Sequence, residues 1–423
     1  MAGMKIFFSV GEPSGDLHGA NLIHELKKRH RGIECVGYGG PRMAAAGCQL
    51  HADLTQLAVM WIARVILNIH KFLGLLIQAD RYFKEQRPDA VVLIDYPGFN
   101  WWIARRAKAQ GILVFYYGAP QIWAWASWRI RKLRRLTDFV LCKLPFEEKW
   151  FRDRGCNAKY VGHPFFDELS QRQLDNSFLN RISSGGGPLV TILPGSRNQE
   201  VAKNLRWLIK ATVRIREQLP HVRFAVASFN ASQADVARRM VLKRQMPIDV
   251  YVNQTPELIQ AADVCLACSG SVSLELLYHT KPAVILYWVD RLSYWFQSKL
   301  RRVRYITLVN LIGMEDPCKM DVSPLSRTEQ ERLPMPEYLT YQDKSAEIAA
   351  HIVRWLSDPR AFETQQSRLG ELRSRFGQSG ASAKAADLVL ENITSKQPPV
   401  PKPHFVPGKS AVPISSGEPA TPL

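Results

Sequence analysis

Eight short apolar runs, mostly separated by helical patterns, constrain the fold of this 423-residue chain more than any other feature. Apolar runs of this kind, without polar alternation, are typical of parallel strands buried on both faces. Their alternation with helical segments predicts an α/β fold with right-handed crossovers. The runs cover residues 5–10, 90–94, 112–116, 139–142, 189–193, 222–227, 264–267 and 283–287.

These runs form two groups on either side of a Ser-Ser-Gly-Gly-Gly segment within residues 181–190, where we place a domain boundary. We expect a Rossmann-like domain over residues 1–180 and another over 187–358, facing each other across a cleft. Helices within 359–395 are expected to pack back on the first domain. The Pro-rich stretch 396–423 has no apolar periodicity, and disorder is predicted for it.

The chain is basic, with 56 Lys and Arg against 38 Asp and Glu and a net charge of +18. This charge favours phosphate-rich partners, whether nucleic acid, anionic lipid or phosphorylated metabolites. Basic clusters mixed with aromatic residues occur at 126–138 and 292–306, but no recognisable nucleic-acid motif accompanies them. We therefore expect lipid headgroups or an anionic acylated substrate, and no nucleic acid.

Seven scattered cysteines form no disulfide framework, which suits a reducing compartment such as the cytoplasm. Cys265 and Cys268 form a C-x-x-C, but no second Cys or His pair stands at zinc spacing. We predict buried structural thiols and no metal site. No apolar stretch is long enough to cross a bilayer.

The first glycine-punctuated loop, "GEPSGD", follows the first apolar run directly. Gly11 and Gly15 bracket a tight turn, and Ser14 or Asp16 is expected to cap the following helix. Backbone N–H groups at such a turn favour an anion or a sugar hydroxyl. The alternative is an ordinary strand-to-helix turn.

A second loop, "LPGSRNQE", predicts a diphosphate clamp. Gly195 lets the backbone approach a ligand, Ser196 offers a hydroxyl and Arg197 offers a fork of donors that matches a phosphate. The alternative is a local ion pair between Arg197 and Glu200.

A third loop, in "CSGSVSLELL", repeats this arrangement with Ser269, Gly270 and Ser271 before a helix. The helix amides would meet a phosphate, and Glu275 would accept hydrogen bonds from ribose hydroxyls. Alternatively, Ser271 and Ser273 only cap the helix and Glu275 is a solvated first-turn acid. Two such loops in one domain indicate a nucleoside diphosphate.

Asp95 ends a very apolar run in the first domain, so its carboxylate is expected at the cleft edge opposite the nucleotide. There it would take a proton from an attacking hydroxyl, unless it is only a cap. His163 is either a structural histidine or a ligand contact.

The segment 56–86 is apolar with interspersed Arg and Lys, which suits a segment lying in a lipid interface. The residues expected to contact lipid or acyl chains are Trp61, Ile66 and Leu73.

Several motifs in their order along the chain resemble the lipid-A-disaccharide synthase family of GT-B glycosyltransferases. The resemblance covers about residues 4–395 and rests on motifs spread along that length. They are "GEPSGDLHGANLI", "GGPRMAAAG", "LAVM", "IDYPGFN", "IWAW", "VGHP", "LPGSRNQE", "CSGSVSLELL" and "YITLVNLIG".

The resemblance implies transfer of a sugar from UDP-2,3-diacylglucosamine to 2,3-diacylglucosamine 1-phosphate, giving a β-1',6-linked disaccharide phosphate and UDP. It implies that the enzyme needs no cofactor and no metal. It also implies a peripheral enzyme that contacts anionic lipids on the cytoplasmic face of the inner membrane. A homodimer is left open. The implied catalytic residue is Asp95, and the implied nucleotide-binding residues are Ser196, Arg197, the loop 269–271, Glu275 and Asn310.

The sequence departs from the family pattern at Trp61, Arg64, Gly98 and Val309, where Gly, an acid, Asp and Pro would be usual. Two alternatives to the synthase stay open, the first because it shares the two-domain architecture and UDP clamp, the second because of the net charge of +18 and of Trp61 and Arg64. One is a non-hydrolysing UDP-amino-sugar epimerase, and the other is a non-enzymatic basic membrane or nucleic-acid-binding protein on a degenerate transferase scaffold.

Overall fold

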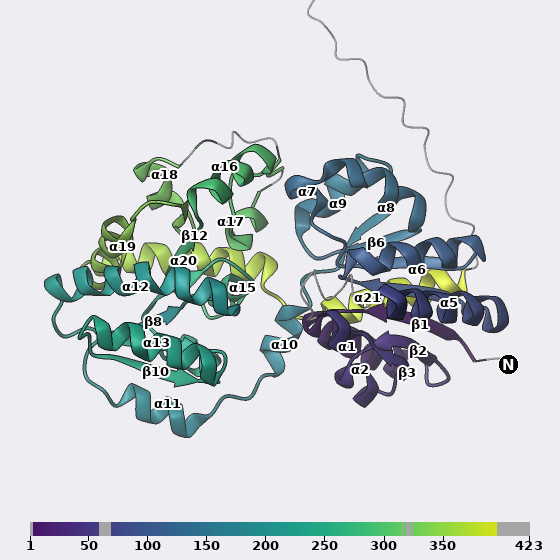
Figure 1. Cartoon of the computed structure of the whole chain (residues 1–423), viewed down its shortest axis with the longest axis horizontal. Coiled ribbons are helices and arrows are strands. Elements are labelled where there is room, and N and C mark those ends of the chain that lie inside the picture. The colour runs from purple at the N-terminus through teal and green to yellow at the C-terminus, as the bar shows by residue number, and fades with distance from the viewer. Residues whose placement is uncertain (1–2, 59–68, 315, 319–322, 324, 396–423) are drawn as a thin grey trace, which may run out of the picture.

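Two parallel sheets form the framework of the molecule (Figure 1). The computed structural model describes residues 3–58, 69–314, 316–318, 323 and 325–395. The first sheet has seven strands in the order β3-β2-β1-β4-β5-β6-β7, and the second has six in the order β10-β9-β8-β11-β12-β13. Both begin with the doubly wound order of Rossmann-type domains. The predicted pair of Rossmann-like sheets is confirmed.

The unit built on the first sheet contains most of the chain before residue 172. Its strands are β1 (Lys5–Val10), β2 (Glu34–Gly39), β3 (Gln49–Asp53), β4 (Ala90–Ile94), β5 (Leu113–Tyr117), β6 (Phe139–Cys142) and β7 (Ala158–Tyr160). Its helices are α1 (Pro13–Arg29), α2 (Pro41–Ala45), α3 (Leu54–Ala58), α5 (Ile69–Gln86), α6 (Pro97–Ala109), α7 (Ile122–Trp125), the 3-10 helix η1 (Ser127–Arg129), α8 (Ile130–Leu136), α9 (Pro145–Arg152) and α10 (Phe165–Gln171).

The unit built on the second sheet follows. Its strands are β8 (Leu189–Leu193), β9 (Arg223–Ser228), β10 (Ile248–Val252), β11 (Val264–Cys268), β12 (Ala283–Trp288) and β13 (Glu337–Thr340). The helices after α10 are α11 (Asn176–Ser183), α12 (Asn198–Gln218), α13 (Ala231–Lys243), α14 (Thr255–Ala261), α15 (Val272–Tyr278), α16 (Arg291–Leu300), α17 (Leu308–Ile312), α18 (Arg327–Arg332), α19 (Ser345–Ser357), α20 (Pro359–Phe376) and α21 (Ala381–Thr394).

Successive residues of the buried strands pack on opposite faces of the first sheet. Phe7 joins the core on the face covered by α5, with Phe83 of that helix. Phe8 joins the core on the other face, with Leu22 of α1 and Val389 of α21. Burial on both faces explains why these strands contain so few polar residues.

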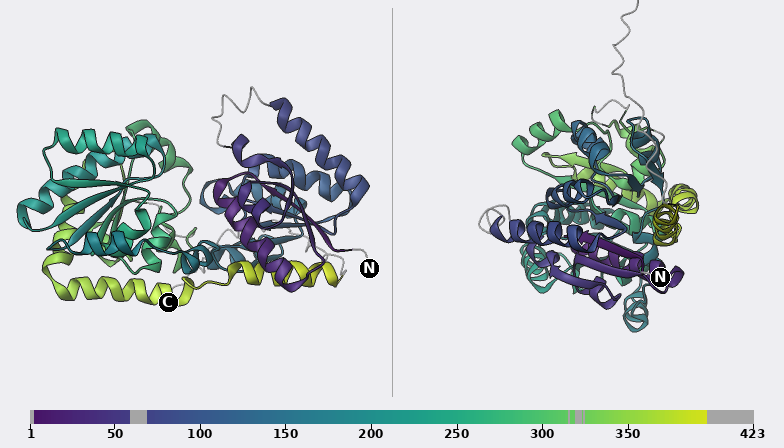
Figure 2. Two further views of the ribbon diagram at one scale, coloured as in Figure 1. Left: turned by 90° about the horizontal axis from the view of Figure 1, so that it is seen from below. Right: turned by 90° about the vertical axis from the view of Figure 1, so that its right-hand side faces the viewer.

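The chain passes between the units more than once (Figure 2). α11 contacts α14 in the second unit, and Phe178 packs edge-on against Tyr251 at 5.1 Å between ring centroids. Within the stretch 359–395, α20 packs on α15, α17 and α19 of the second unit, and only α21 returns to the first unit against α1. Asp167 fixes the start of α21 by accepting hydrogen bonds from Gly380, Ala381 and Ser382.

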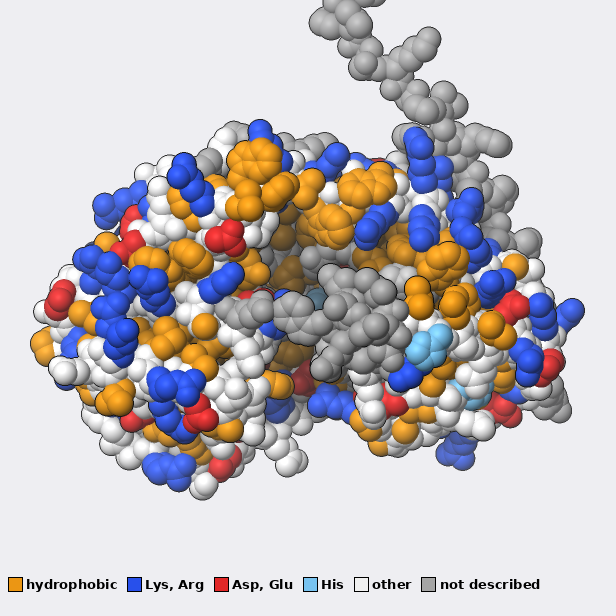
Figure 3. All heavy atoms as spheres, viewed as in Figure 1, with side chains coloured by type: hydrophobic (Ala, Val, Ile, Leu, Met, Phe, Trp, Pro, Cys, Tyr) orange, Lys and Arg blue, Asp and Glu red, His pale blue; other side chains and the backbone are white. Residues whose placement is uncertain are grey.

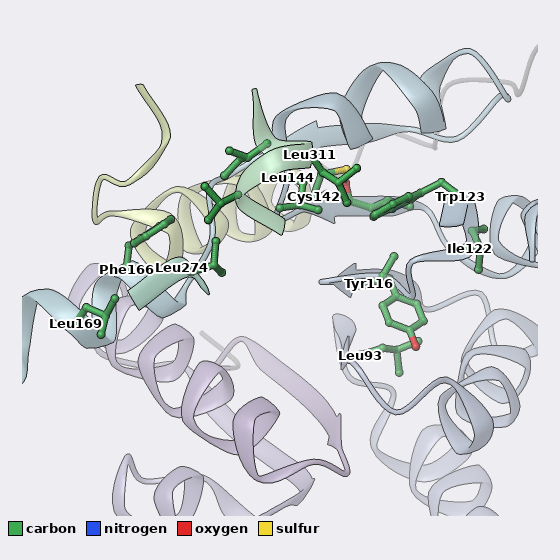
Figure 4. Close-up of a cluster of buried hydrophobic side chains, with 14 of the residues drawn as sticks. Leu93, Tyr116, Ile122, Trp123, Cys142, Leu144, Phe166, Leu169, Leu274 and Leu311 are labelled. Carbon is green, nitrogen blue, oxygen red and sulfur yellow. The ribbon is translucent and has the colours of Figure 1, made fainter. Parts of the chain in front are cut away.

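One apolar cluster extends from the first unit into the second (Figure 4). Trp123 and Leu144 contribute from the first unit, and Leu274 and Leu311 from the second. A buried apolar contact of this kind stabilises the packing of the two units against each other.

The structure contains all eight predicted strands, with ends that differ by one residue at most. It also contains five strands that the apolar runs did not predict, namely β2, β3, β7, β10 and β13. The predicted disorder of 396–423 lies outside the described residues.

Candidate active site

Asp95 follows β4 directly, where the chain turns into α6 through two residues with left-handed backbone geometry. The φ angles are 47° at Asp95 and 39° at Tyr96, a conformation that costs about 1–3 kcal/mol per residue. Asn100 Nδ2 donates to the Asp95 carbonyl at 2.9 Å, and the Tyr116 hydroxyl donates to the same oxygen at 2.7 Å. Ser9 fixes Asn100 in turn, through a 2.6 Å hydrogen bond to its Oδ1. The turn is therefore rigid.

The carboxylate of Asp95 forms an ion pair that the sequence did not predict. Lys143, which follows β6, donates from Nζ to Asp95 Oδ1 at 2.9 Å. The two side chains are only 19% and 18% exposed, so water screens the pair weakly. Burial lowers the pKa of Lys143, but the charge and hydrogen bond of Asp95 outweigh burial and raise it.

Both glycines of the first loop permit close packing beside Asp95. A Cβ on Gly11 would lie 2.4 Å from the Tyr96 ring. A Cβ on Gly15 would lie 2.9 Å from Val10 Cγ1 and 3.8 Å from Asp95 Oδ2. Because Gly15 has no side chain, it leaves space beside the carboxylate oxygen that Lys143 does not bind.

Glu12, in the same loop, lies where the two units come close to each other. Desolvation raises the pKa of Glu12, and the nearby charge of Asp95 raises it further. Lys143 and Arg197 lower that pKa. Asp95 belongs to the first unit and Arg197 to the second, so charges from both units act on Glu12.

Ser14 and Asp16 do not cap the helix that follows the loop, so this prediction is wrong. α1 begins at Pro13, and both residues lie inside its first turn. Asp16 is 3% exposed, and its Oδ1 accepts hydrogen bonds from the amides of Gly40 at 2.8 Å and Met43 at 3.1 Å. It therefore anchors the start of α2, whereas Ser14 is exposed.

A pocket of about 140 Å³ lies at the carboxyl ends of β8 and β11 in the second unit. The loops predicted to bind the diphosphate form its walls, with Gly195 and Ser196 from one loop and residues 269–271 from the other. Gly195 has a φ of 121°, which favours glycine. The N-terminus of the 21-residue helix α12 follows the first loop, and its amides and dipole favour an anion.

Arg197 makes the local contact that the sequence left as the alternative. Its Nη1 donates to Glu200 Oε1 at 2.9 Å. The Arg197 side chain is nevertheless 81% exposed and stands at the N-cap of α12. It can therefore turn toward an anion in the pocket without disturbing the core.

Glu275 is buried, so the alternative of a solvated first-turn acid is wrong. Arg172, which follows α10, donates to Glu275 Oε1 at 2.5 Å and to Glu168 Oε1 at 2.5 Å. Burial raises the pKa of Glu275 to about 7, and the charge of Arg172 opposes this shift. Through Arg172, Glu275 thus joins the second unit to the segment that links the two units. The expected contact of Glu275 with ribose hydroxyls stays a prediction.

Asn310 lies in α17 with its amide engaged inside the second unit. It donates to the Met335 carbonyl at 2.7 Å and to Glu337 Oε2 at 3.0 Å, and its Oδ1 accepts from the Met335 amide. Glu337 also accepts from the backbone of Ile306 at 2.8 Å. The Ile306 carbonyl accepts the Ser269 hydroxyl at 3.0 Å. Through these bonds, Asn310 indirectly supports Ser269 in the wall of the pocket at the ends of β8 and β11, which we call the donor pocket.

His163 has a structural environment. Its Nδ1 accepts from the Phe165 amide at 3.2 Å, and its ring lies 6.3 Å from that of His18 between centroids. Burial lowers the pKa of both histidines, to about 4 for His18, and the charge of Lys143 lowers both further. Both rings are neutral near pH 7.

Cys265 and Cys268 lie buried in β11 with free thiols. In the part of the chain that the structure describes, no three or more His, Cys, Asp or Glu side chains gather in a way that could hold a metal ion. Of the four departures from the family pattern, Trp61 and Arg64 lie outside the described residues. Val309 is buried, and the space around the Gly98 Cβ position is open.

Two Rossmann-type sheets, with a carboxylate at the end of a central strand of one and a pocket at the ends of two central strands of the other, have the GT-B type of fold. Among solved structures, a UDP-GlcNAc 2-epimerase from Neisseria meningitidis bound to UDP-GlcNAc has a TM-score of 0.60 at 11% identity, covering 92% of this chain and 100% of that one. The calicheamicin glycosyltransferase CalG4 has a TM-score of 0.56 at 15% identity, covering 94% and 100%. At such identities the likeness shows the fold alone.

Sequence comparison is more specific. The family model described as lipid-A-disaccharide synthetase matches residues 6–350. A lipid-A-disaccharide synthase of Anaeromyxobacter dehalogenans is 33% identical over 389 residues, covering 91% of this chain and 97% of the relative. Another of Coxiella burnetii is 31% identical over 405 residues, covering 93% and 100%. The chain therefore belongs to the lipid-A-disaccharide synthase family.

Family membership makes the protein a hexosyltransferase, as the resemblance implied. The epimerase alternative is supported only by the shared fold. The alternative of a non-enzymatic binding protein is supported only by the net positive charge of the chain. Neither is supported by sequence identity.

The raised pKa of Glu275 predicts a pH-dependent loss of stability. The folded state holds this proton up to about pH 7 and the unfolded state only to about 4.5, so the free energy of unfolding falls as pH rises through that window, by at most about 3 kcal/mol. The Glu275→Gln variant lacks this ionisation. In urea titrations from pH 5 to pH 8, the wild type should therefore lose stability relative to the variant.

A matched control is Glu371→Gln, since the side chain of Glu371 is 73% exposed. Its stability should follow that of the wild type across the same range. A constant difference between the wild type and Glu275→Gln from pH 5 to pH 8 would contradict the raised pKa.

Proposed function

We propose that this protein transfers 2,3-diacylglucosamine from UDP-2,3-diacylglucosamine to the 6-hydroxyl of 2,3-diacylglucosamine 1-phosphate, with inversion at the anomeric carbon. The products are a β-1',6-linked disaccharide 1-phosphate and UDP. Family membership supports a UDP-sugar donor and a hexosyl transfer. The observation that carries the proposal is the Asp95 carboxylate, held by Lys143 at the end of β4 in the first unit, together with the pocket at the ends of β8 and β11 in the second unit.

Asp95 is the general base in this proposal. The acceptor 6-hydroxyl oxygen attacks the anomeric carbon, the bond from that carbon to the phosphate oxygen breaks, and the hydroxyl proton passes to Asp95. Lys143 binds Oδ1, so Oδ2, on the side of Gly15, is the oxygen that receives the proton. The ion pair with Lys143 orients the carboxylate before the acceptor binds.

The second unit stabilises the leaving UDP. Negative charge develops on the diphosphate as the glycosidic bond breaks. The amides at the start of α12 and the hydroxyl of Ser196 lie at the donor pocket, where they can donate to the diphosphate. Arg197 exchanges Glu200 for the diphosphate, because a doubly charged partner attracts the guanidinium more strongly than one carboxylate does.

The acylated substrates require contact with a membrane, and α5 has a suitable surface. Ile69, Leu73 and Ile77 are 58%, 53% and 63% exposed, while Phe72 and Leu76 of the same helix are buried. The helix is thus apolar on the side facing the core and on part of the side facing solvent. Trp61 and Ile66, predicted to act with Leu73, lie outside the described residues.

Further apolar and basic side chains gather along the upper edge of the face shown in Figure 3. The exposed aromatic residues of α6, α7, η1 and α16 are Trp102, Trp125, Trp128, Trp295 and Phe296. Five basic residues from α6 and α8 line an adjacent open groove: Arg105, Arg131, Lys132, Arg134 and Arg135. Aromatic rings beside cationic side chains are typical of surfaces that bind anionic lipid.

We therefore place the protein at the cytoplasmic face of the inner membrane as a peripheral enzyme. Of the helices that the structure describes, none has both the length and the apolarity needed to cross a bilayer. The homodimer stays a prediction.

A product assay tests the proposed reaction. The purified protein is incubated with UDP-2,3-diacylglucosamine and 2,3-diacylglucosamine 1-phosphate, and the products are identified by mass spectrometry. The proposal predicts a disaccharide 1-phosphate and an equal amount of UDP. An epimerised UDP-sugar would support the epimerase instead, and the absence of both products and of UDP binding would support a non-enzymatic scaffold.

Arg197→Ala should weaken UDP binding about tenfold to a hundredfold, since hydrogen bonds to charged groups contribute about 1.5–3 kcal/mol. Calorimetry with UDP measures the effect. Arg238→Ala is the control, because Arg238 is an exposed arginine of α13 in a similar local ion pair, with Asp235. Equal affinities in both variants would show that Arg197 stays with Glu200 when UDP binds.

Replacing Ile69, Leu73 and Ile77 together by Ser should lower binding to vesicles rich in anionic phospholipid at least tenfold in a sedimentation assay, because three exposed apolar side chains are lost from the surface. Leu242→Ser removes a similarly exposed leucine from α13 and should bind vesicles as the wild type does. Unchanged binding of the triple variant would assign membrane contact to another surface.

A further inference from the structure

A second cavity, of about 370 Å³, lies between the two units and has no part in the mechanism described so far. Trp123, Ala124 and Trp125 of α7 line one side, and Val303, Leu308 and Leu311 are among the residues that line the other. The volume is in the range of about 300–1,000 Å³ that is usual for small-molecule sites. The Arg302 amide donates to the Ala124 carbonyl at 2.8 Å, so a hydrogen bond joins the two sides.

This cavity is a close neighbour of the donor pocket. Ile306 lines the cavity, and its carbonyl accepts the hydroxyl of Ser269, which lines the donor pocket. A hydrogen bond therefore joins the wall of one space to the wall of the other. More of the lining residues come from the second unit than from the first. Because the proposed donor binds to the second unit, we expect the occupant of the cavity to be part of the donor and not of the acceptor.

The inner wall of the cavity is rigid. Trp123 is 1% exposed, and its Nε1 donates to Glu147 Oε1 at 2.9 Å. Glu147 Oε2 accepts from the amides of Lys143 and Leu144, which fixes the carboxylate in turn. Leu311 is buried on the opposite side. In Figure 4, Trp123 and Leu311 both belong to the apolar cluster that joins the units. A wall held in this way can limit the length of a chain that enters the cavity.

The mouth of the cavity opens on the surface that we assign to the membrane. Trp125 and Leu300 line the cavity and are 46% and 55% exposed. Trp125 belongs to α7, and the exposed Trp128 follows that helix closely. Leu300 belongs to α16, which also contains the exposed rings of Trp295 and Phe296. An acyl chain that leaves the bilayer at this surface can thus enter the cavity without crossing a wide layer of water.

We propose that this cavity binds one acyl chain of the donor sugar and that Trp123, Leu308 and Leu311 set the chain length that the protein accepts. The inference rests on the proposed function, because the chain belongs to the proposed donor. The occupant is an acyl chain because the lining is largely hydrocarbon, the mouth faces the surface assigned to lipid, and the donor pocket is adjacent.

The test compares donors that have the same UDP-glucosamine headgroup and acyl chains of ten or fourteen carbons, with one fixed acceptor. Ala124→Leu places three more carbons in the cavity, whereas Leu308→Ala enlarges it. Each buried methylene contributes about fourfold in binding. If Ala124→Leu excludes two methylenes of the longer chain, the ratio of kcat/KM for the longer donor to kcat/KM for the shorter donor should fall about fifteenfold. Leu308→Ala should shift this ratio in the opposite direction.

Ser127→Leu is the matched control, since residue 127 follows α7 closely and is not among the residues that line the cavity. Its ratio should equal that of the wild type. Thermal unfolding of every variant checks that the fold is intact, and calorimetry should give wild-type affinity for UDP in Ala124→Leu.

An unchanged ratio in both cavity variants, with disaccharide still formed, would overturn the acyl-chain assignment and leave the proposed function standing. In a reciprocal series with one fixed donor and acceptor chains of ten or fourteen carbons, a shift for the acceptor without a shift for the donor would also overturn it. Failure of the wild type to bind UDP and to form disaccharide would be a failure of the proposed function itself.

Discussion

The left-handed turn at Asp95 and Tyr96 is the constraint on which the rest of the site depends. Two consecutive residues with positive φ are unfavourable, and hydrogen bonds from Asn100 and Tyr116 to the Asp95 carbonyl offset that cost. The turn directs the carboxylate away from the strand, where Lys143 meets it. A residue in an ordinary extended conformation would continue the line of β4. The geometry of the proposed base is therefore set by side-chain hydrogen bonds to its own carbonyl, from residues of the same unit.

The site is complete only when the two units are held together, and several contacts of different kinds do this. Arg172 joins the linking segment to the buried Glu275, and Asp167 fixes α21 after its return from the second unit. The hydrogen bond from Arg302 to Ala124 and the apolar cluster around Trp123 join the facing edges. These contacts position the donor pocket relative to Asp95, and they also form the cavity to which we assign an acyl chain.

The sequence predicted those strands that are buried on both faces, because such strands need continuous apolar runs. Four of the five strands that it did not predict, β3, β7, β10 and β13, are the edges of the two sheets, where a half-exposed strand can be short and partly polar. Asp95, Ser196 and Ser269 could be predicted as site residues because each stands near the end of an apolar run, and parallel strands end at one edge. Lys143 and Arg172 could not, since their partners are 48 and 103 residues away and only tertiary packing brings them together.

Turnover of Asp95→Asn, compared with its affinity for UDP, tests the central claim most directly. Asparagine keeps the size of the side chain and an oxygen for Lys143, but it cannot take a proton from the acceptor hydroxyl. We expect kcat to fall about a hundredfold or more while the Kd for UDP stays nearly unchanged. Near-normal turnover would contradict the assignment of Asp95 as the base, and an equal loss of UDP affinity would contradict the placement of Asp95 outside the donor pocket.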